Sequence, residues 1–482
     1  MTAALRFGGQ EIAPQDFEAA ARRAAGALER LGVREGDTVC ILLNNGPAFL
    51  EATFGARMLG AYYCPINWHY KAEEAGWMLK DSGAKALVTE PALLAQIEAG
   101  VFEGLSVITP DAFSSVPPWN GSDRSPGAMM PYTSGTTGRA KGVRRVPLTA
   151  PQLEAAAQLT SMVLGIAPGM RALLPAPLYH SAPNSYSSNV MQRGALLVLE
   201  ERFDAERTLA LIQDLGLTHA YLVPTMYVRL LRLPEATKKR YDLSSMRFVA
   251  STGSACPPDV KRAMIDWWGP VFHESYAASE LGYITAISSE EALRKPGSAG
   301  RAVGGATIRI RDADGRDLPA GEIGLIYARQ PAYPDFTYNN DPDSRAKIER
   351  DGLWTLRDMG FLDPEGYLYV CDRASDMVIS GGVNIYPAEI EAALAMMPGV
   401  RDCAVFGIPD AEFGEALCAA VQTEADMEVS SQDVQDYLKK KLADYKVPKR
   451  VTFHDELPRE ESGKIFKRRL RAPYWEKAGR KI

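Results

Sequence analysis

The chain has 482 residues, enough for one large and one smaller domain, and its 46% hydrophobic and 24% charged content is ordinary for a globular protein. No apolar run approaches the ~18 residues of a membrane span, and the first residues lack the basic start and apolar centre of a secretion signal. The six cysteines are scattered without a Cys-x-x-Cys pair, which argues against a zinc site or a disulfide framework. We therefore expect a cytoplasmic protein with no integral membrane segment.

Helical and strand patterns alternate along most of the chain. We predict helices over 17–31, 49–59, 72–80, 152–164, 205–215, 225–231 and 259–268. We predict strands over 38–43, 86–88, 129–133, 171–174, 220–223 and 248–251. Gly32 and Gly216 stand where they would cap the C-termini of two of these helices. Short β/α units of this kind build sheets packed between helices.

Two changes of pattern follow in the second half of the chain. Over 306–329 a β-hairpin around Asp-Ala-Asp-Gly at 312–315 predicts a small β subdomain. Near residues 372–373 a compact β/α segment begins and runs to the end. The predicted fold class is therefore α/β, with a large N-terminal domain of β-sheets packed with helices, a small β subdomain, and a small α+β C-terminal domain.

A run of hydroxyls and glycines closed by a lysine occupies residues 132–142, Tyr-Thr-Ser-Gly-Thr-Thr-Gly-Arg-Ala-Lys-Gly. Glycines let backbone N–H groups turn inward, hydroxyls add donors, and a lysine neutralises what is held, so the composition is typical of a phosphate-binding loop. The spacing differs from the nucleoside-triphosphate loop Gly-x-x-x-x-Gly-Lys-Ser/Thr, because Val143 begins a strand rather than a helix. Taken alone, the stretch could also be an ordinary Ser/Thr/Gly turn.

Basic residues are concentrated at the C-terminal end, where residues 436–482 hold 15 Lys/Arg against 7 Asp/Glu. Such a tail could be a solvated surface, a dock for a small polyanion, or a nucleic-acid patch. No zinc-finger or RNA-recognition signature accompanies the charge, so we expect no nucleic-acid partner.

Further short motifs follow the glycine-rich run in a fixed order. They are Pro-Leu-Tyr-His-Ser-Ala-Pro at 177–183, Ser-Thr-Gly-Ser-Ala-Cys-Pro at 251–257, Tyr-Ala-Ala-Ser-Glu at 276–280, Trp-Thr-Leu-Arg-Asp at 354–358, Asp-Arg-Ala-Ser-Asp at 372–376 leading into Ser-Gly-Gly-Val-Asn at 380–384, and Leu-Pro-Arg-Glu-Glu-Ser-Gly-Lys-Ile at 457–465. In this order they resemble the adenylate-forming superfamily of acyl-CoA synthetases, adenylation domains and luciferases. The resemblance covers nearly the whole chain.

The resemblance implies an ATP-dependent carboxylic acid–CoA ligase that uses ATP, Mg²⁺ and coenzyme A. A carboxylate is a poor electrophile, so its oxygen first attacks the α-phosphate of ATP to give an acyl-adenylate, from which a thiol then displaces AMP. Such a protein must hold a triphosphate and stabilise its charge, largely through positioned electrostatics.

The family's site residues map onto this sequence motif by motif. The β- and γ-phosphates would be bound by Thr133, Ser134, Gly135, Thr136, Thr137, Gly138 and Lys141. The adenine side would comprise Gly253, Ser254, Ala255, Tyr276 and Ala277. Glu280 and Thr133 would bind Mg²⁺, an ion that prefers hard oxygen ligands.

The remaining chemistry falls to a few side chains. Ser279 would contact the α-phosphate, Asp358 the ribose hydroxyls, and Arg373 the same ribose or the phosphate, while Lys464 would be the adenylation catalyst. From the residues alone, Asp358 and Arg373 could instead each be half of a surface ion pair. In the same way Glu280 could be a surface residue and Tyr276 a core residue.

Family members rotate a mobile C-terminal domain between the two half-reactions. Here the implied division is an N-terminal domain at 1–372, a hinge at 373–376 and a C-terminal domain at 377–482. Gly381, Gly382 and Asn384 would then face the pantetheine of CoA. Candidate contacts for the CoA phosphates are Lys439, Lys440, Lys441, Lys446 and Arg468.

Substrate choice is assigned to a pocket beside His180, which could alternatively be a hydrogen-bonded core histidine. The resemblance implies that the other pocket residues are mostly small and apolar: Ala182, Asn184, Tyr221, Val223, Thr225, Gly253, Ser254 and Ala277. No residue there pairs with an amino acid's charges, which argues against amino-acid activation. A small-molecule fatty, aryl or steroid-type acid is expected.

The sequence departs from the family's pattern at several points. Ser375 replaces the usual hinge Asp or Lys, Leu356 and Arg357 replace the Thr-Gly before Asp358, and Ala277 replaces a glycine in the acyl pocket. One alternative is an adenylating enzyme that passes the acyl group to a carrier protein or an amine. Another is a non-catalytic nucleotide-binding relative, which the presence of Lys464 argues against.

Overall fold

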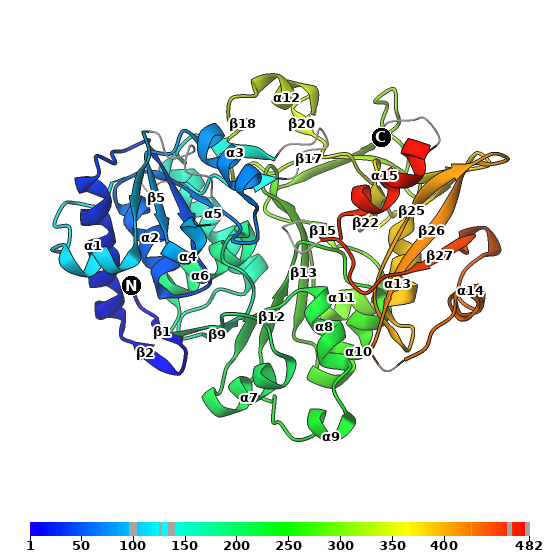
Figure 1. Cartoon of the computed structure of the whole chain (residues 1–482), viewed down its shortest axis with the longest axis horizontal. Helices are drawn as coiled ribbons and strands as arrows, with labels where there is room; N and C mark the ends of the chain where they lie inside the picture. Colours follow the sequence, from blue (N-terminus) through cyan, green and yellow to red (C-terminus); the bar gives the residue numbers. More distant parts are fainter. Residues whose placement is uncertain (96–103, 125–127, 134–139, 426, 460–464, 478–482) are drawn as a thin grey trace. The chain divides into compact units, whose positions relative to one another are not determined.

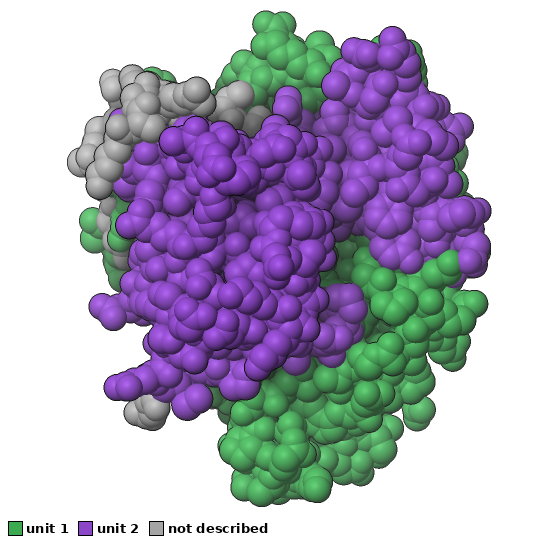
Figure 2. Space-filling view, turned by 90° about the vertical axis from the view of Figure 1, so that its right-hand side faces the viewer, with its two compact units in different colours: residues 1–256, 261–308, 328–354 green, residues 257–260, 309–327, 355–482 purple. Residues whose placement is uncertain are grey.

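The computed structural model describes residues 1–95, 104–124, 128–133, 140–425, 427–459 and 465–477. The chain divides into two compact units (Figure 2). Unit 1 contains residues 1–256, 261–308 and 328–354, and unit 2 contains residues 257–260, 309–327 and 355–482. The hinge at 373–376 stays a prediction.

The largest sheet of unit 1 has a parallel centre with antiparallel edges (Figure 1). Its strands are β1 (Ala4–Phe7), β2 (Gln10–Ile12), β9 (Arg171–Leu174), β10 (Leu196–Leu199), β11 (His219–Tyr221), β12 (Phe248–Ser251), β13 (Phe272–Ala278), β14 (Gly282–Ile287) and β15 (Arg301–Ala302). Their order is β15-β14-β13-β12-β11-β9-β10-β1-β2. The six strands from β13 to β1 are parallel, so the carboxyl ends of β12 and β13 lie at the same edge. This edge of a parallel sheet is where ligands of open α/β folds bind.

A second sheet of unit 1 is entirely parallel. It contains β3 (Thr38–Leu42), β4 (Tyr62–Pro65), β5 (Ala86–Thr89) and β6 (Ser106–Ile108), in the order β4-β3-β5-β6. The strands β3, β4 and β5 are buried throughout, as expected of a sheet covered on both faces. Nearby along the chain are α1 (Pro14–Arg30), α2 (Pro47–Met58), α3 (Ala72–Ser82), α4 (Pro91–Leu94) and the 3₁₀ helix η2 (Pro110–Ser115).

Local sequence signals define several helix ends. The other helices before residue 348 are α5 (Ala150–Leu164), α6 (Ser181–Arg193), α7 (Ala205–Leu215), α8 (Pro224–Leu231), α9 (Glu235–Lys238), α10 (Pro258–Trp268), α11 (Ser289–Arg294) and α12 (Pro342–Lys347). In α7 the N-cap Asp204 accepts a hydrogen bond from the Arg207 N–H, and Gly216 ends the helix in the left-handed conformation, which confirms the predicted cap.

A three-stranded antiparallel sheet carries the glycine-rich stretch. Its strands are β7 (Tyr132–Thr133), β8 (Lys141–Arg145) and β18 (Phe336–Tyr338), in the order β18-β8-β7. The predicted strand over 129–133 is too long, because only its last two residues belong to β7 and Met129 forms a single bridge with Tyr63. Strands β7 and β8 pair as the two arms of a hairpin.

The predicted β subdomain is present, with one difference. Its strands are β16 (Thr307–Arg311), β17 (Gly324–Arg329), β19 (Glu349–Arg350), β20 (Leu353–Trp354), β21 (Asp358–Leu362) and β22 (Leu368–Arg373). The Gly315 N–H donates to the Asp312 carbonyl over 3.0 Å, which confirms the predicted turn. Because β17 begins only at Gly324, the connection is longer than the predicted tight hairpin.

The C-terminal part of unit 2 is a sheet with an apolar cluster on each face. Its elements are β23 (Val378–Ser380), β24 (Val383–Ile385), α13 (Pro387–Ala395), β25 (Val400–Asp410), β26 (Gly414–Thr423), α14 (Ser431–Lys439), η3 (Asp444–Lys446), β27 (Arg450–Phe453) and α15 (Lys467–Lys477). Along β25, Val405 packs with Ile390 and Leu438, whereas its neighbour Phe406 packs with Leu470. This period-two alternation places helices on both faces. It confirms a small α+β C-terminal domain.

Two expectations about absent features concern the described residues only. In the ranges given above, no helix combines the length and apolarity needed to cross a membrane. The same residues contain no cluster of His, Cys, Asp and Glu suited to a metal ion. All six cysteines are free thiols, and five of them are buried.

A buried ion pair supports β13 from the side of α10. Lys261 Nζ lies 2.7 Å from Glu274 Oε2, and the two side chains are 9% and 8% exposed. Burial raises the pKa of Glu274 above its ordinary value of 4.5, while Lys261 opposes this. The charged carboxylate therefore depends on its lysine, and the same strand β13 contains Tyr276 and precedes Glu280.

We predict that Lys261→Met lowers the free energy of unfolding by about 3–5 kcal/mol at pH 8, because it leaves a buried charge unpaired. The folded-state pKa of Glu274 then rises further, so the loss shrinks as the pH falls towards 4.5 and grows as the pH rises. Urea unfolding at pH 5 and pH 8 measures both effects. In the control Arg240→Met, which breaks an exposed pair with Glu206, the loss should stay below about 1 kcal/mol. Equal small losses in both variants would contradict the prediction.

Candidate active site

The hairpin formed by β7 and β8 holds the ends of the glycine-rich stretch. Thr133 pairs with Lys141, and Tyr132 pairs with Gly142. A Cβ atom on Gly142 would lie 2.9 Å from the Tyr132 ring, so only glycine permits this close approach. The predicted phosphate ligands Ser134, Gly135, Thr136, Thr137 and Gly138 lie outside the described residues.

Glu280 is buried beside this hairpin, in the turn between β13 and β14. Its side chain is held at Oε1, which accepts hydrogen bonds from Thr133 Oγ1 at 2.9 Å and from the Tyr338 hydroxyl at 3.2 Å. Glu280 is 5% exposed, so it is no ordinary surface glutamate. Burial, together with the Glu280 carboxylate, raises the pKa of Tyr338, which keeps its hydroxyl a donor. Among the described residues none donates a hydrogen bond to Oε2.

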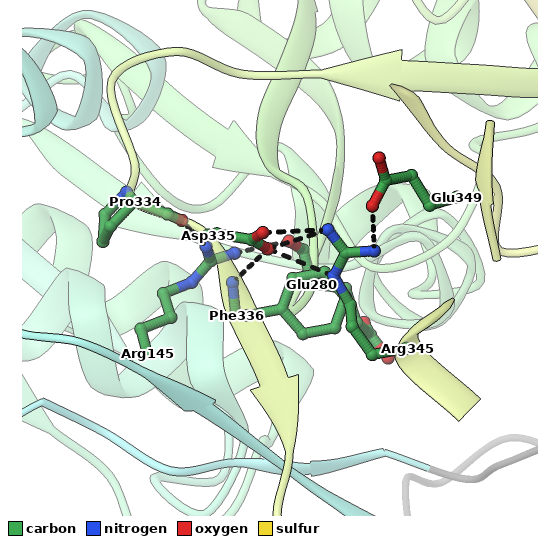
Figure 3. Close-up of polar contacts among 7 residues, drawn as sticks. All are labelled: Arg145, Glu280, Pro334, Asp335, Phe336, Arg345 and Glu349. Carbon is green, nitrogen blue, oxygen red and sulfur yellow. Dashed lines mark hydrogen bonds and ion pairs between the residues drawn. The ribbon is translucent and has the colours of Figure 1, made fainter. Parts of the chain in front are cut away.

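Arginines surround the β18 end of this network (Figure 3). Arg345 binds Asp335 at 3.0 Å and Glu349 at 2.8 Å, and its guanidinium lies over the Trp354 ring. Arg145 donates instead to backbone carbonyls, those of Pro334, Ser279 and Glu280. These contacts fix the start of β18 and the backbone of the Ser279–Glu280 turn.

Lys141 is held by a carboxylate of the protein. Its Nζ lies 2.9 Å from Asp341 Oδ2, donates to Ser344 Oγ, and lies 5.3 Å from the Tyr338 ring centroid. Asp341 caps the N-terminus of α12, and hydrogen bonds from Ser344 and Lys141 lower its pKa to about 2. The expected contact of Lys141 with phosphate stays a prediction, and Lys141 already has an anchoring role.

Tyr132 is anchored on the other side of the hairpin. Its hydroxyl donates to Asp81 Oδ2 over 2.6 Å, and Asp81 lies in the last turn of α3. Asn340 donates to the Asp81 carbonyl and carboxylate, and Asn339 donates to the same carbonyl. Both arms of the hairpin are therefore tied to neighbouring elements.

The expected adenine-side residues meet at the carboxyl edge of β12 and β13. Gly253, with φ of +94°, begins an exposed turn after β12 that includes Ser254 and Ala255. Tyr276 and Ala277 are half-buried near the end of β13, at an irregularity in its pairing with β14. The structure thus brings this expected set together at one edge of the sheet.

Ser279 and the acyl-side residues surround the start of α6. The Ser279 and Ser181 hydroxyls are 3.3 Å apart, within hydrogen-bonding distance. His180 immediately precedes α6, and its ring centroid lies 4.4 Å from that of Tyr179. Asn184 is fully buried, where it accepts from the Tyr63 hydroxyl and donates to the Leu178 carbonyl. These contacts give Asn184 a packing role, and its place in an acyl pocket stays a prediction.

In unit 2, Asp358 and Arg373 face each other across β21 and β22. Arg373 Nε lies 3.6 Å from Asp358 Oδ1, so the two expected ribose contacts are paired with one another. Arg357, at the position where the family usually has glycine, has φ of +65°, a conformation that glycine adopts more readily. The residue type departs from the family pattern, while the backbone conformation is one that glycine favours.

The expected CoA-side residues form the turn of the β23–β24 hairpin. Gly381 and Gly382 have φ of +57° and +81°, and a Cβ atom on Gly381 would lie 2.9 Å from the Phe413 ring. Asn384 is exposed on β24. Of the basic candidates, Lys446 pairs with Glu389 and Lys439 with Asp436. Lys464 lies outside the described residues.

Comparison with known proteins identifies the family of this chain. The sequence pattern of the AMP-binding enzyme family matches residues 2–333, and that of the AMP-binding enzyme C-terminal domain matches residues 389–464. The chain therefore belongs to the AMP-binding enzyme family.

Three similar proteins are informative. A feruloyl-CoA synthase of an Amycolatopsis species is 33% identical over 473 residues, which cover 97% of this chain and 95% of that protein. The long-chain-fatty-acid–CoA ligase FadD13 of Mycobacterium tuberculosis is 34% identical, covering 95% and 92%. The structure of o-succinylbenzoate CoA synthetase from Bacillus subtilis with its acyl-adenylate intermediate matches with a TM-score of 0.82 and 30% identity, covering 97% and 94%.

We predict that Asp341→Asn raises KM for ATP about fivefold, a coupling of roughly 1 kcal/mol, because Lys141 loses its anchor beside the loop. The asparagine oxygen can still cap α12, and Asp341 is 38% exposed, so unfolding stability should change by less than about 1 kcal/mol. Initial rates at varied ATP and a thermal melt measure the two quantities. The matched control is Asp343→Asn on the exposed side of α12. An unchanged KM in Asp341→Asn would show that the pair does not act on the loop.

Proposed function

We propose that this protein is an AMP-forming acid–CoA ligase that activates an apolar monocarboxylic acid. The observation that carries the proposal is the buried Glu280 carboxylate, held between the glycine-rich hairpin and β18 at the carboxyl edge of the main sheet. A triphosphate in the loop would need a cation, and Glu280 would supply a ligand for it through Oε2, to which no described residue donates.

Two displacements make up the reaction. In the first, a carboxylate oxygen of the acid attacks the α-phosphorus of ATP, the bond to the bridging oxygen breaks, and pyrophosphate leaves. In the second, the CoA thiolate attacks the acyl carbonyl, and AMP leaves with the electrons of the acyl–oxygen bond. The thioester keeps the acyl carbon at its original oxidation level.

The donor set fits Mg²⁺, which usually binds one or two carboxylates and takes its other ligands from phosphates and water. Glu280 would hold the ion, assisted by Thr133, and the ion would neutralise phosphate charge. Thr133, through its hydrogen bond to Glu280, orients the carboxylate, and Ser279 places a hydroxyl at the same edge.

Unit 2 supplies the other proposed roles. Asp358 and Arg373 bind the ribose, Lys464 stabilises the charge that develops during adenylation, and Gly381, Gly382 and Asn384 admit the pantetheine. The hinge at 373–376 lets residues 377–482 present Lys464 in one half-reaction and Gly381, Gly382 and Asn384 in the other. We also propose that the protein is located in the cytoplasm.

An apolar acid is favoured by the residues expected around His180 and by the similarity to enzymes named for feruloyl and long-chain fatty acyl substrates. The second candidate function is acyl transfer to a carrier protein or an amine. The basic C-terminal segment favours CoA, because free CoA carries phosphates that a carrier protein's phosphopantetheine arm lacks.

The test separates the two half-reactions across acids of graded length and ring content. Pyrophosphate release should require acid and ATP but no CoA, and AMP release should then require CoA. Pyrophosphate release without any response to CoA would favour the carrier-protein or amine reading. Absence of pyrophosphate release with every acid would contradict the proposal.

We predict that Lys464→Ala reduces acyl-adenylate formation by about 10²–10³-fold, because it removes a positioned charge that acts in the transition state. Conversion of a supplied acyl-adenylate to thioester should stay within about threefold of the unmodified enzyme, since that step needs no charge at the α-phosphate. Single-turnover assays measure each half-reaction separately. Lys449→Ala, which removes an exposed lysine paired with Asp410, is the control. Equal loss in both half-reactions would contradict the assigned role of Lys464.

A further inference from the structure

Arg145 is a cation at the end of β8 that is held by carbonyl oxygens. It donates to the carbonyls of Pro334 at 2.6 Å and Ser279 at 3.1 Å, and also to that of Glu280. Its guanidinium lies 5.6 Å from the ring centroids of Tyr333 and Phe336. Among the described residues, no carboxylate oxygen lies within 4.0 Å of an Arg145 guanidinium nitrogen, so none forms an ion pair with Arg145.

Burial of this cation has an energetic cost, which its hydrogen bonds must offset. Burial lowers the pKa of Arg145 to about 10, although nearby Tyr333 and Glu280 oppose the shift. The guanidinium nevertheless stays protonated at neutral pH, and each of its carbonyl contacts is a charge-assisted hydrogen bond. The planar fork joins two segments that are far apart in the chain, the Ser279–Glu280 turn and Pro334, and a lysine ammonium lacks this fork geometry.

The position of Arg145 relates the loop to the carboxylate. Thr133 ends the arm that leads into the glycine-rich stretch, and Arg145 ends the arm that leads out of it. Thr133 holds the side chain of Glu280, and Arg145 holds its backbone carbonyl. Tyr338, on the strand paired with β8, holds the same carboxylate. Glu280 therefore receives hydrogen bonds from both strands of one hairpin, β7 and β8. Figure 3 shows Arg145 beside Glu280.

We propose that Arg145 is a positioning residue that fixes the Glu280 carboxylate relative to strands β7 and β8 for adenylation. This inference rests on the proposed role of Glu280 toward Mg²⁺. Arg145 touches no reacting atom in this scheme. It acts through the Ser279–Glu280 backbone, so that Glu280 keeps a fixed position relative to the β7–β8 hairpin.

The test uses the full chain and compares Arg145→Met with Arg145→Lys. In Arg145→Met we expect kcat for pyrophosphate release to fall at least about tenfold, because small misplacements of a positioned group have large kinetic effects. The free Mg²⁺ concentration at half-maximal rate should rise, and KM for the acid should stay within about twofold. Arg145→Lys should give intermediate values, because it keeps the charge without the fork. Conversion of a supplied acyl-adenylate to thioester should be unaffected in both.

Arg144→Met is the matched control. Arg144 precedes Arg145 on β8, donates to the Gly36 carbonyl, and lies over the Tyr62 ring, away from Glu280. It should retain the unmodified rates and Mg²⁺ dependence. Folded Arg145→Met with the same Mg²⁺ dependence and kcat as Arg144→Met would overturn the inference, and so would equal loss in both half-reactions. If Arg145→Met does not fold, Arg145→Lys decides by the same criteria.

Glu280→Gln separates this inference from the function on which it rests. If Glu280→Gln leaves adenylation and its Mg²⁺ dependence unchanged, the metal role of Glu280 fails, and the role of Arg145 fails with it. If Glu280→Gln alters them and the Arg145 variants do not, only the positioning role is overturned. If both alter them in the same direction, the inference is supported.

Discussion

A carboxylate removed from water loses hydration that its surroundings must replace, and Glu280 is in this position at 5% exposure. Its donors come from Thr133 on β7 and Tyr338 on β18, two strands of one small sheet separated by about two hundred residues of sequence. The carboxylate is therefore satisfied only when β7, β8 and β18 pair in the observed register. The hydrogen bonds of this carboxylate therefore depend on the pairing of this sheet.

The broad fold was accessible from the sequence because its signals are local. Alternating β/α patterns and the Gly216 cap depend on neighbouring residues, and the structure confirms them. The helix α6 was not predicted, because its sequence is rich in Ser and Asn, and three of its buried residues are Asn184, Ser187 and Ser188. A helix that buries small polar side chains shows no apolar periodicity, so pattern reading misses it.

The residues of the candidate site also differ in whether a local sequence signal marks them. Glu280 and Thr133 belong to short motifs on which the family resemblance rests, whereas Arg145, Tyr338 and Asp341 stand outside these motifs. Adjacent arginines at 144 and 145 look like a solvated pair of charges in the sequence. Only the pairing of β8 with β18, and the turn after β13, reveals that one of them contacts three carbonyls. Such a contact depends on tertiary register, which no short segment encodes.

Asp81 shows how far the anchoring of the hairpin reaches. A negative charge in the last turn of a helix opposes the helix dipole, typically by about 0.3–1 kcal/mol. Asp81 occupies that position in α3, and its carboxylate accepts from Tyr132 and Asn340. The local preference of α3 is thus overridden by contacts with β7 and with the segment before α12. Replacing Asp81 to stabilise α3 as an isolated helix would remove the hydrogen bond that anchors Tyr132 on β7. The helix α3 is therefore less stable than another residue at position 81 would make it.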